Sequence, residues 1–179
     1  MQLPFRDLSK RNAIPMALAA LMALTLAGYS STTRAASDGN AEAMEAFAKA
    51  QEHRSRGDVR SARIELMNAI KADPQWTDAR IFQAEILLKL FDGIGAEAEL
   101  ERAFALGLDP SQVRHLYGHA LQLQGKWDKA KEQLFADDIP EQHQAYAARI
   151  VGRIALQTGD ADLATQAFDH AIQLDAANP

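Results

Sequence analysis

Two pairs of side chains, each spaced by four residues, are the first candidates for chemistry in this sequence. His115 and His119 would lie on one face of a helix, a spacing that lets two imidazoles share a metal ion. The stretch His-Leu-Tyr-Gly-His lacks the glutamate of zinc proteases, and a third ligand would have to be Glu85. We therefore predict no metal site. We favour two groove histidines that hydrogen-bond water or a peptide, and a pH-sensitive contact is a further option because histidine titrates near neutrality.

The second pair is Arg149 and Arg153. Guanidinium groups form charge-assisted hydrogen bonds with carboxylates, so a peptide carboxylate or a sugar acid is one candidate ligand. The alternative is that both arginines are solvated and paired with nearby acidic side chains.

The rest of the composition favours a binding protein over an enzyme. The chain has no cysteine, which excludes disulfides, thiolate metal sites and a cysteine nucleophile. It shows no Ser–His–Asp grouping, glycine-rich phosphate loop or paired-carboxylate motif. The net charge of −5 argues against nucleic acid as a partner, because phosphate binding requires a basic surface. We predict neither catalytic residues nor a cofactor.

Three sets of residues recur every 34 positions and define the elements that must position these side chains. The period is typical of the tetratricopeptide repeat (TPR), in which a first helix (helix A) and a second (helix B) stack on the next copy. The resemblance implies an all-α, TPR-type α-solenoid of four helix–turn–helix repeats in a right-handed superhelix. The repeats are 43–76, 77–110, 111–144 and 145–178. The sets are Ala62, Ala96, Ala130 and Ala164; Ala50, Ala84, Gly118 and Gly152; and Leu66, Leu100, Leu134 and Phe168.

Two units depart from the pattern. The A-to-B turns are expected at glycines, but the second unit has Phe91 there. Because a bulky residue with positive φ is unfavourable, we expect that turn to shift onto Gly93. In the third unit Asp137 replaces an alanine of helix B, and Pro140 follows. We expect helix B to end near Ala136, and a longer helix to run from Pro140 to about Thr158.

In TPR arrays helix A lines the inner, concave groove. The resemblance therefore implies a groove that binds a protein or peptide partner, apolar at its N-terminal end and cationic at its C-terminal end. The groove positions of this chain are Met44, Phe47, Gln51, Asp78, Ile81, Glu85, Gln112, His115, His119, Tyr146, Arg149 and Arg153.

The head of the chain is typical of an export signal. Basic residues within 1–12 precede an uncharged apolar stretch over 13–28, shorter than a membrane span. We assign 1–36 to a signal peptide or export segment, which could associate with a membrane, and 37–42 to a polar tether. Tyr29 replaces the lipid-bearing cysteine of a bacterial lipoprotein box, so we expect no lipid anchor. The predicted location is the periplasm or envelope of a Gram-negative bacterium.

A narrower resemblance covers residues 43–178. The segments GDVRSARIELMNAIKADPQWTDAR, GAEAELERAFALGLDPSQV and LFADDIPEQHQAYAARIVGRIALQTGD resemble the N-terminal part of TPR-repeat lipoproteins of bacterial PEP-CTERM systems. Those systems couple exopolysaccharide production to surface sorting of proteins. The resemblance implies an exported scaffold or accessory factor in such a complex. The chain departs from that family in lacking the lipidated cysteine and in having only four repeats.

Three alternatives remain. The chain could be a structural subunit that forms a homo-oligomer through its C-terminal repeat, where Phe168, Ile172 and Leu174 lie on a terminal helix with one open side. It could be an accessory protein in pilus or secretin assembly. It could also be a truncated gene product.

Overall fold

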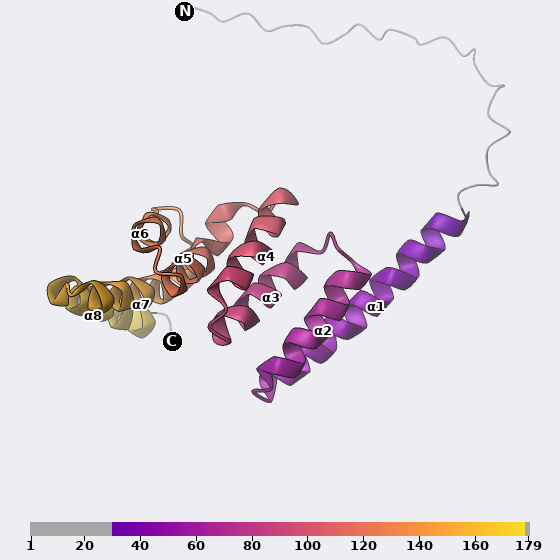
Figure 1. Ribbon diagram of the computed structural model, residues 1–179, viewed down its shortest axis with the longest axis horizontal. Helices are drawn as coiled ribbons and strands as arrows, with labels where there is room; N and C mark the ends of the chain where they lie inside the picture. Colours follow the sequence, from indigo (N-terminus) through magenta and orange to yellow (C-terminus); the bar gives the residue numbers. More distant parts are fainter. Residues whose placement is uncertain (1–29, 178–179) are drawn as a thin grey trace, which may run out of the picture.

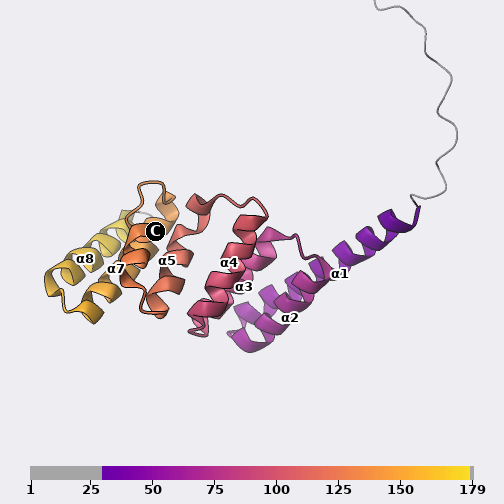
Figure 2. The same cartoon turned by 45° about the horizontal axis from the view of Figure 1, so that its top comes forward.

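The computed structural model describes residues 30–177, and these residues form eight α-helices and one short 3-10 helix. Consecutive α-helices pack as antiparallel pairs, and the pairs lie side by side along the molecule (Figures 1 and 2). This arrangement confirms the predicted all-α TPR fold. None of the described helices is long and apolar enough to cross a membrane. The elements are α1 (Ser30–Ser55), α2 (Val59–Ala72), α3 (Thr77–Lys89), α4 (Gly93–Ala105), η1 (Pro110–Val113), α5 (Arg114–Leu123), α6 (Trp127–Leu134), α7 (Glu141–Thr158) and α8 (Ala161–Ala177).

The small residues of the 34-residue pattern allow the two helices of a pair to approach closely. A Cβ added to Gly118 would lie 2.5 Å from Leu134 Cγ, and one added to Gly152 would lie 2.7 Å from the Phe168 ring. In the first two units the second helix of each pair supplies a small residue, Ala62 or Ala96, and neither has any exposed surface. Each pair therefore buries large apolar side chains against a helix that carries only hydrogen or methyl at the contact.

The turns of the first and last units follow the expected pattern. Gly57 and Gly159 have φ of 78° and 81°, the left-handed conformation that only glycine adopts at little cost. The aspartate after each glycine caps the next helix: Asp58 Oδ1 accepts from Ser61 N (3.1 Å) and Asp160 Oδ1 from Leu163 N (3.0 Å).

The second turn corrects a prediction. The turn stays on Phe91, which has φ of 60°, and Gly93 is the first residue of α4. The left-handed residue allows Asp92 N to donate to Leu87 O (2.9 Å), while the Asp92 side chain accepts from Gly95 N (2.8 Å). A Cβ on Gly93 would lie 2.7 Å from Ala120 O, so this glycine serves close packing against α5.

The third unit is short, as expected. Helix α6 ends at Leu134, and α7 begins at Glu141 after Pro140 and continues to Thr158. The linker between them is held to the array at two points. The Arg114 guanidinium donates to both Asp138 carboxylate oxygens (2.6 and 3.1 Å), and Ile139 is buried.

The head of the chain differs in part from expectation. Residues 37–42, predicted as a polar tether, lie inside α1, which begins at Ser30. Most of the predicted export segment, 1–29, lies outside the described residues.

Candidate partner-binding groove

Three hollows follow the helix-A side of the array and meet at Glu85. Their volumes are about 200, 360 and 410 Å³. The first lies between α1 and α3, the second is lined by α3, α5 and the start of α7, and the third is lined by the same three helices farther along. Because all three share Glu85, and neighbouring hollows share further lining residues, they form one continuous groove.

The structure brings together almost all of the residues that the sequence pattern assigned to the groove. Met44 and Arg153 are the two that line none of the three hollows. Met44 is 61% exposed on α1, and Arg153 contacts His119 from α7. The assigned residues that do line it are Phe47, Gln51, Asp78, Ile81, Glu85, Gln112, His115, His119, Tyr146 and Arg149.

The N-terminal end of the groove is aromatic, with an ion pair beside it. The Phe47 ring lies 4.6 Å from the Trp76 ring and 5.4 Å from the Phe82 ring. The Arg54 guanidinium lies over Phe82, 4.6 Å from the ring centroid, and bonds Glu85 at 3.0 Å. Burial raises the pKa of Glu85, and Arg54 opposes that shift.

Two stacked imidazoles form the middle of the groove. His115 on α5 and His143 on α7 have ring centroids 3.8 Å apart and planes inclined by 14°. His115 is 5% exposed, and its Nδ1 has no hydrogen-bond partner among the described residues. Burial, followed by the neighbouring His143, lowers the pKa of His115 to about 3. Burial also lowers the pKa of His143, so protonation of either ring is disfavoured in this stack.

A second cluster fixes the tautomer of His119. Its Nε2 lies 3.2 Å from the Arg153 guanidinium, and its Nδ1 lies 2.6 Å from the Tyr146 hydroxyl oxygen. Arginine is only a donor, so Nε2 accepts and Nδ1–H donates to the tyrosine oxygen. Burial, followed by the Arg153 charge, lowers the pKa of His119 to about 4. The Tyr146 hydroxyl keeps its own hydrogen for another acceptor, and burial raises the pKa of that hydroxyl to about 12.

Both arginines at the cationic end of the groove already contact other side chains of this chain. Arg149 bonds Asp175 of α8 at 2.6 Å, which is the pairing with a nearby acid that we held as the alternative. Arg153 is engaged by His119. Within 30–177 no group of three or more His, Cys, Asp or Glu side chains could hold a metal ion.

Two groove residues escaped the sequence pattern because of the irregular third unit. Gln142 and His143 line the groove ahead of the predicted start of the fourth repeat at 145. The pattern counts positions from that start, whereas α7 already begins at Glu141. Pro140 could have indicated these two residues, because a helix that begins after it adds one turn of groove-facing side chains.

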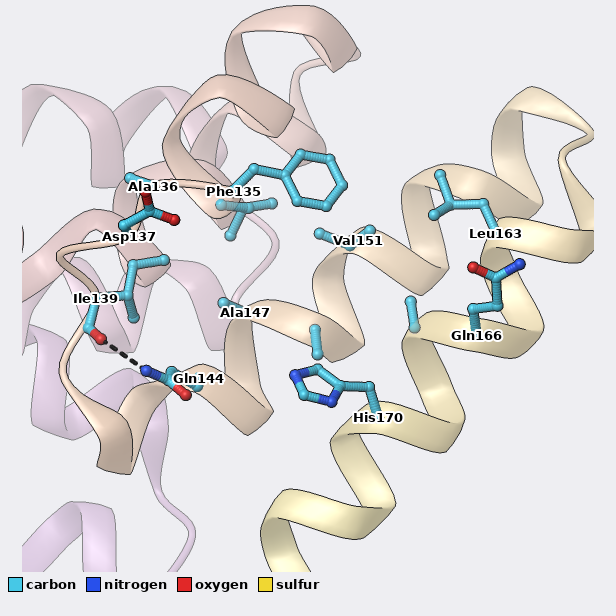
Figure 3. Close-up of a pocket in the computed structure, with 13 residues that line it drawn as sticks. Phe135, Ala136, Asp137, Ile139, Gln144, Ala147, Val151, Leu163, Gln166 and His170 are labelled. Atoms are coloured by element: carbon cyan, nitrogen blue, oxygen red, sulfur yellow. Dashed lines mark hydrogen bonds between the residues drawn. The ribbon is translucent and has the colours of Figure 1, made fainter.

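A further hollow of about 400 Å³ lies against the opposite face of α7, and the sequence did not predict it. Figure 3 shows it between the end of α6, the linker, α7 and α8. Its lining residues are Leu134, Phe135, Ala136, Asp137, Ile139, Gln144, Ala147, Ala148, Val151, Leu163, Gln166, Ala167 and His170.

Comparison with known proteins agrees with the geometry. Residues 150–178 match the family described as tetratricopeptide repeat. Among solved structures, PilF of Pseudomonas aeruginosa is similar at a TM-score of 0.59 and 20% identity, over 78% of this chain and 64% of that one. MamA is similar at a TM-score of 0.59 and 18% identity, over 82% of this chain and 85% of that one. No curated protein sequence is similar enough to count as a match. The chain thus contains a tetratricopeptide repeat, and its helices as a whole have the tetratricopeptide-repeat fold.

Proposed function

We propose that this chain is an exported scaffold whose concave groove binds an extended or helical segment of a protein partner. The continuity of the three hollows through Glu85 is the observation that carries this proposal. A partner segment could contact α1, α3, α5 and α7 in one stretch, as concave surfaces of repeat arrays permit.

The chemistry of the groove defines what the partner segment must offer. An apolar side chain suits the aromatic end formed by Phe47, Trp76 and Phe82. A hydrogen-bond acceptor suits the Tyr146 hydroxyl, whose hydrogen is left free because His119 Nδ1–H donates to its oxygen. A carboxylate is the favoured acceptor, since it could also compete with Asp175 for Arg149.

Site-specific photocrosslinking in envelope extract tests the groove. A photoreactive residue at Gln142, exposed inside the groove, should capture the partner, and the same residue at Lys129, exposed on α6, should not. Phe47→Ala and Tyr146→Phe should each reduce the yield from Gln142. Identical products from both positions would sink the groove proposal.

The cellular setting rests on the sequence. The apolar head and the resemblance of 43–178 to PEP-CTERM lipoproteins support a scaffold in an envelope complex for exopolysaccharide production or protein sorting. The intact mass of the mature protein from cell envelopes tests export. Cleavage near Ser30 or Ala35 is expected, whereas a full-length cytoplasmic protein would contradict the proposal. Loss of surface polysaccharide in cells carrying Phe47→Ala would support the pathway.

A second candidate function is self-association through the C-terminal repeat. Ile172 on α8 is 65% exposed, and α8 lies at one end of the array (Figure 1). Sedimentation equilibrium over a range of concentrations tests it: a dimer that Ile172→Glu disrupts is expected. A strict monomer at high concentration would exclude this candidate.

A further inference from the structure

The hollow behind α7 lies beside a helix that is shorter than its counterpart in the second unit. Helix α4 of the second unit has 13 residues, whereas α6 of the third has 8. Ala103, near the end of α4, is fully buried, and the residue one repeat later is Asp137, exposed in the linker. The space that the last turns of α6 would occupy is therefore open.

The neighbouring unit shows what belongs in such a space. There the Phe104 ring of α4 packs edge-on against Tyr117 of α5 at 5.5 Å. One repeat later these positions hold Asp138 and Val151. Asp138 bonds Arg114, so the position equivalent to Phe104 supplies no ring, and Val151 lines the hollow. An apolar side chain presented by a helix would restore the contact seen in the second unit.

The walls of the hollow also have helical spacing. Gln144, Ala147, Ala148 and Val151 line it from α7, while Leu163, Gln166, Ala167 and His170 line it from α8. Each set follows the i, i+3, i+4, i+7 pattern of one helical face. Tyr146 and Arg149 lie on the opposite face of α7, so this hollow is separate from the groove. Figure 3 shows Phe135 extending from the end of α6 over the hollow.

The charges around the hollow indicate which kind of segment it would bind. Asp137 of the linker after α6 lines the hollow, and Asp162 and Asp169 on α8 adjoin the lining residues Leu163 and His170 in the sequence. The linker (135–140) and α8 contain no lysine or arginine, and His170 is the one imidazole among the described lining residues. An acidic rim around an apolar floor is complementary to a segment that is apolar on one side and basic at its flanks.

From these observations we propose a second docking site, beyond the groove: the hollow between α6, α7 and α8 binds a short amphipathic helix of a partner protein, with apolar side chains on Val151 and Ala148 and basic side chains toward Asp137. The partner helix takes the place that the last turns of α6 leave open. The array would then hold two partners, one on each face of α7.

Fluorescence anisotropy with the full chain tests this site. The probe is a labelled synthetic helical peptide with leucines at i, i+3, i+4 and i+7 and lysines at its flanks, and its control carries glutamates in place of the lysines. The basic peptide should bind about tenfold more tightly than the acidic one, and added salt should weaken it. Equal affinity for both peptides would overturn the proposed charge selection.

Matched variants locate the binding. Ala148→Phe fills the hollow and should weaken binding about tenfold, whereas Ala105→Phe, at the exposed end of α4, should leave it unchanged. Asp137→Lys should weaken binding severalfold, and Glu132→Lys, with the same change in net charge, should not. Circular dichroism checks that each variant folds. If Ala148→Phe and Ala105→Phe bind alike, the peptide lies elsewhere and the proposal is wrong.

Two further measurements separate this site from its rivals. Tyr146→Phe should not affect peptide binding, so a loss with this variant would place the peptide in the groove and overturn the proposal. A dimer in sedimentation equilibrium that Ala148→Phe dissociates would show that a second copy of the chain fills the hollow, again against the proposal.

Discussion

His115 on α5 and His143 on α7 stack face to face, with ring centroids 3.8 Å apart. The contact joins α5 to α7 in the floor of the groove and disfavours a charge on both rings at once. Two imidazolium ions at this separation would repel in a site with little water to screen them. Simultaneous protonation of His115 and His143 therefore opposes the folded state.

This relationship predicts that acid destabilises the fold. The pKa of His115 is lowered to about 3 and that of His119 to about 4, from 6.5. Below pH 6.5 the unfolded chain therefore takes up protons at these residues before the folded chain does. The free energy of unfolding should fall by about 1.4 kcal/mol per pH unit for each histidine. Urea unfolding between pH 7 and pH 5 measures this slope. His115→Gln should reduce it, exposed His170→Gln should not, and equal slopes for wild type and His115→Gln would contradict the prediction.

The pairing of Gly152 with Phe168 predicts a compensating double substitution. Gly152→Ala should destabilise the fold by about 1–3 kcal/mol, because the new Cβ meets the Phe168 ring at 2.7 Å. Adding Phe168→Leu should restore most of the loss, since Ala84 and Leu100 form this pair in the second unit, both fully buried. Thermal or urea unfolding of both single variants and the double variant provides the test. A Gly152→Ala variant as stable as wild type would show that the helices can separate freely.

The turn at Phe91 predicts a stabilising change. Phe91→Gly should raise the free energy of unfolding by about 1 kcal/mol, because glycine adopts the observed φ of 60° without the steric cost of a side chain. Gly93→Ala should lower it, because its Cβ would lie 2.7 Å from Ala120 O and 2.8 Å from Leu123 Cβ. Destabilisation by Phe91→Gly would mean that the exposed ring makes contacts that outweigh the backbone cost.

The Arg80–Glu99 ion pair, which joins α3 to α4, predicts a large effect on stability. The Arg80 guanidinium bonds Glu99 at 2.8 Å and Pro74 O at 2.6 Å, and the two side chains are only 11% and 15% exposed. Arg80→Met should lower the free energy of unfolding by about 3 kcal/mol, because it leaves the mostly buried Glu99 carboxylate without this partner.

Arg56, exposed and paired with Glu52, is the matched control for that ion pair. Arg56→Met should lower the free energy of unfolding by less than about 1 kcal/mol. The double variant Arg80→Met/Glu99→Leu should recover part of the loss, because it removes both buried charges. Equal costs for Arg80→Met and Arg56→Met in urea unfolding would show that burial adds nothing to this pair.

Periodic positions account for what sequence reasoning predicted well. Ala62, Ala96, Leu66 and Leu100 meet the same neighbours in every unit, so residue type at a 34-residue interval is enough to place them in the core. The early end of α6 and the start of α7 after Pro140 were also predictable, because proline acts on the backbone locally. Local and repeated interactions can be recognised without knowing the tertiary structure.

The positions that sequence reasoning missed depend on neighbours from other units. Phe91 takes an unfavourable φ because Gly93 is needed where α4 meets Ala120 of α5. His143 joins the groove only because α7 begins one turn early beside α5. In each case a contact between helices outweighs the local preference.

By itself, the sequence determined the period of 34 residues, the pairing of helices and the alternation of small and large core residues. Only the tertiary structure decided how the inner-face residues interact: the His115–His143 stack, the His119 tautomer set by Arg153, and the hollow beside Val151. The physical reason is that a repeat specifies its own helices through local backbone and packing preferences. Hydrogen-bond partners and empty space arise only where side chains from different repeats meet.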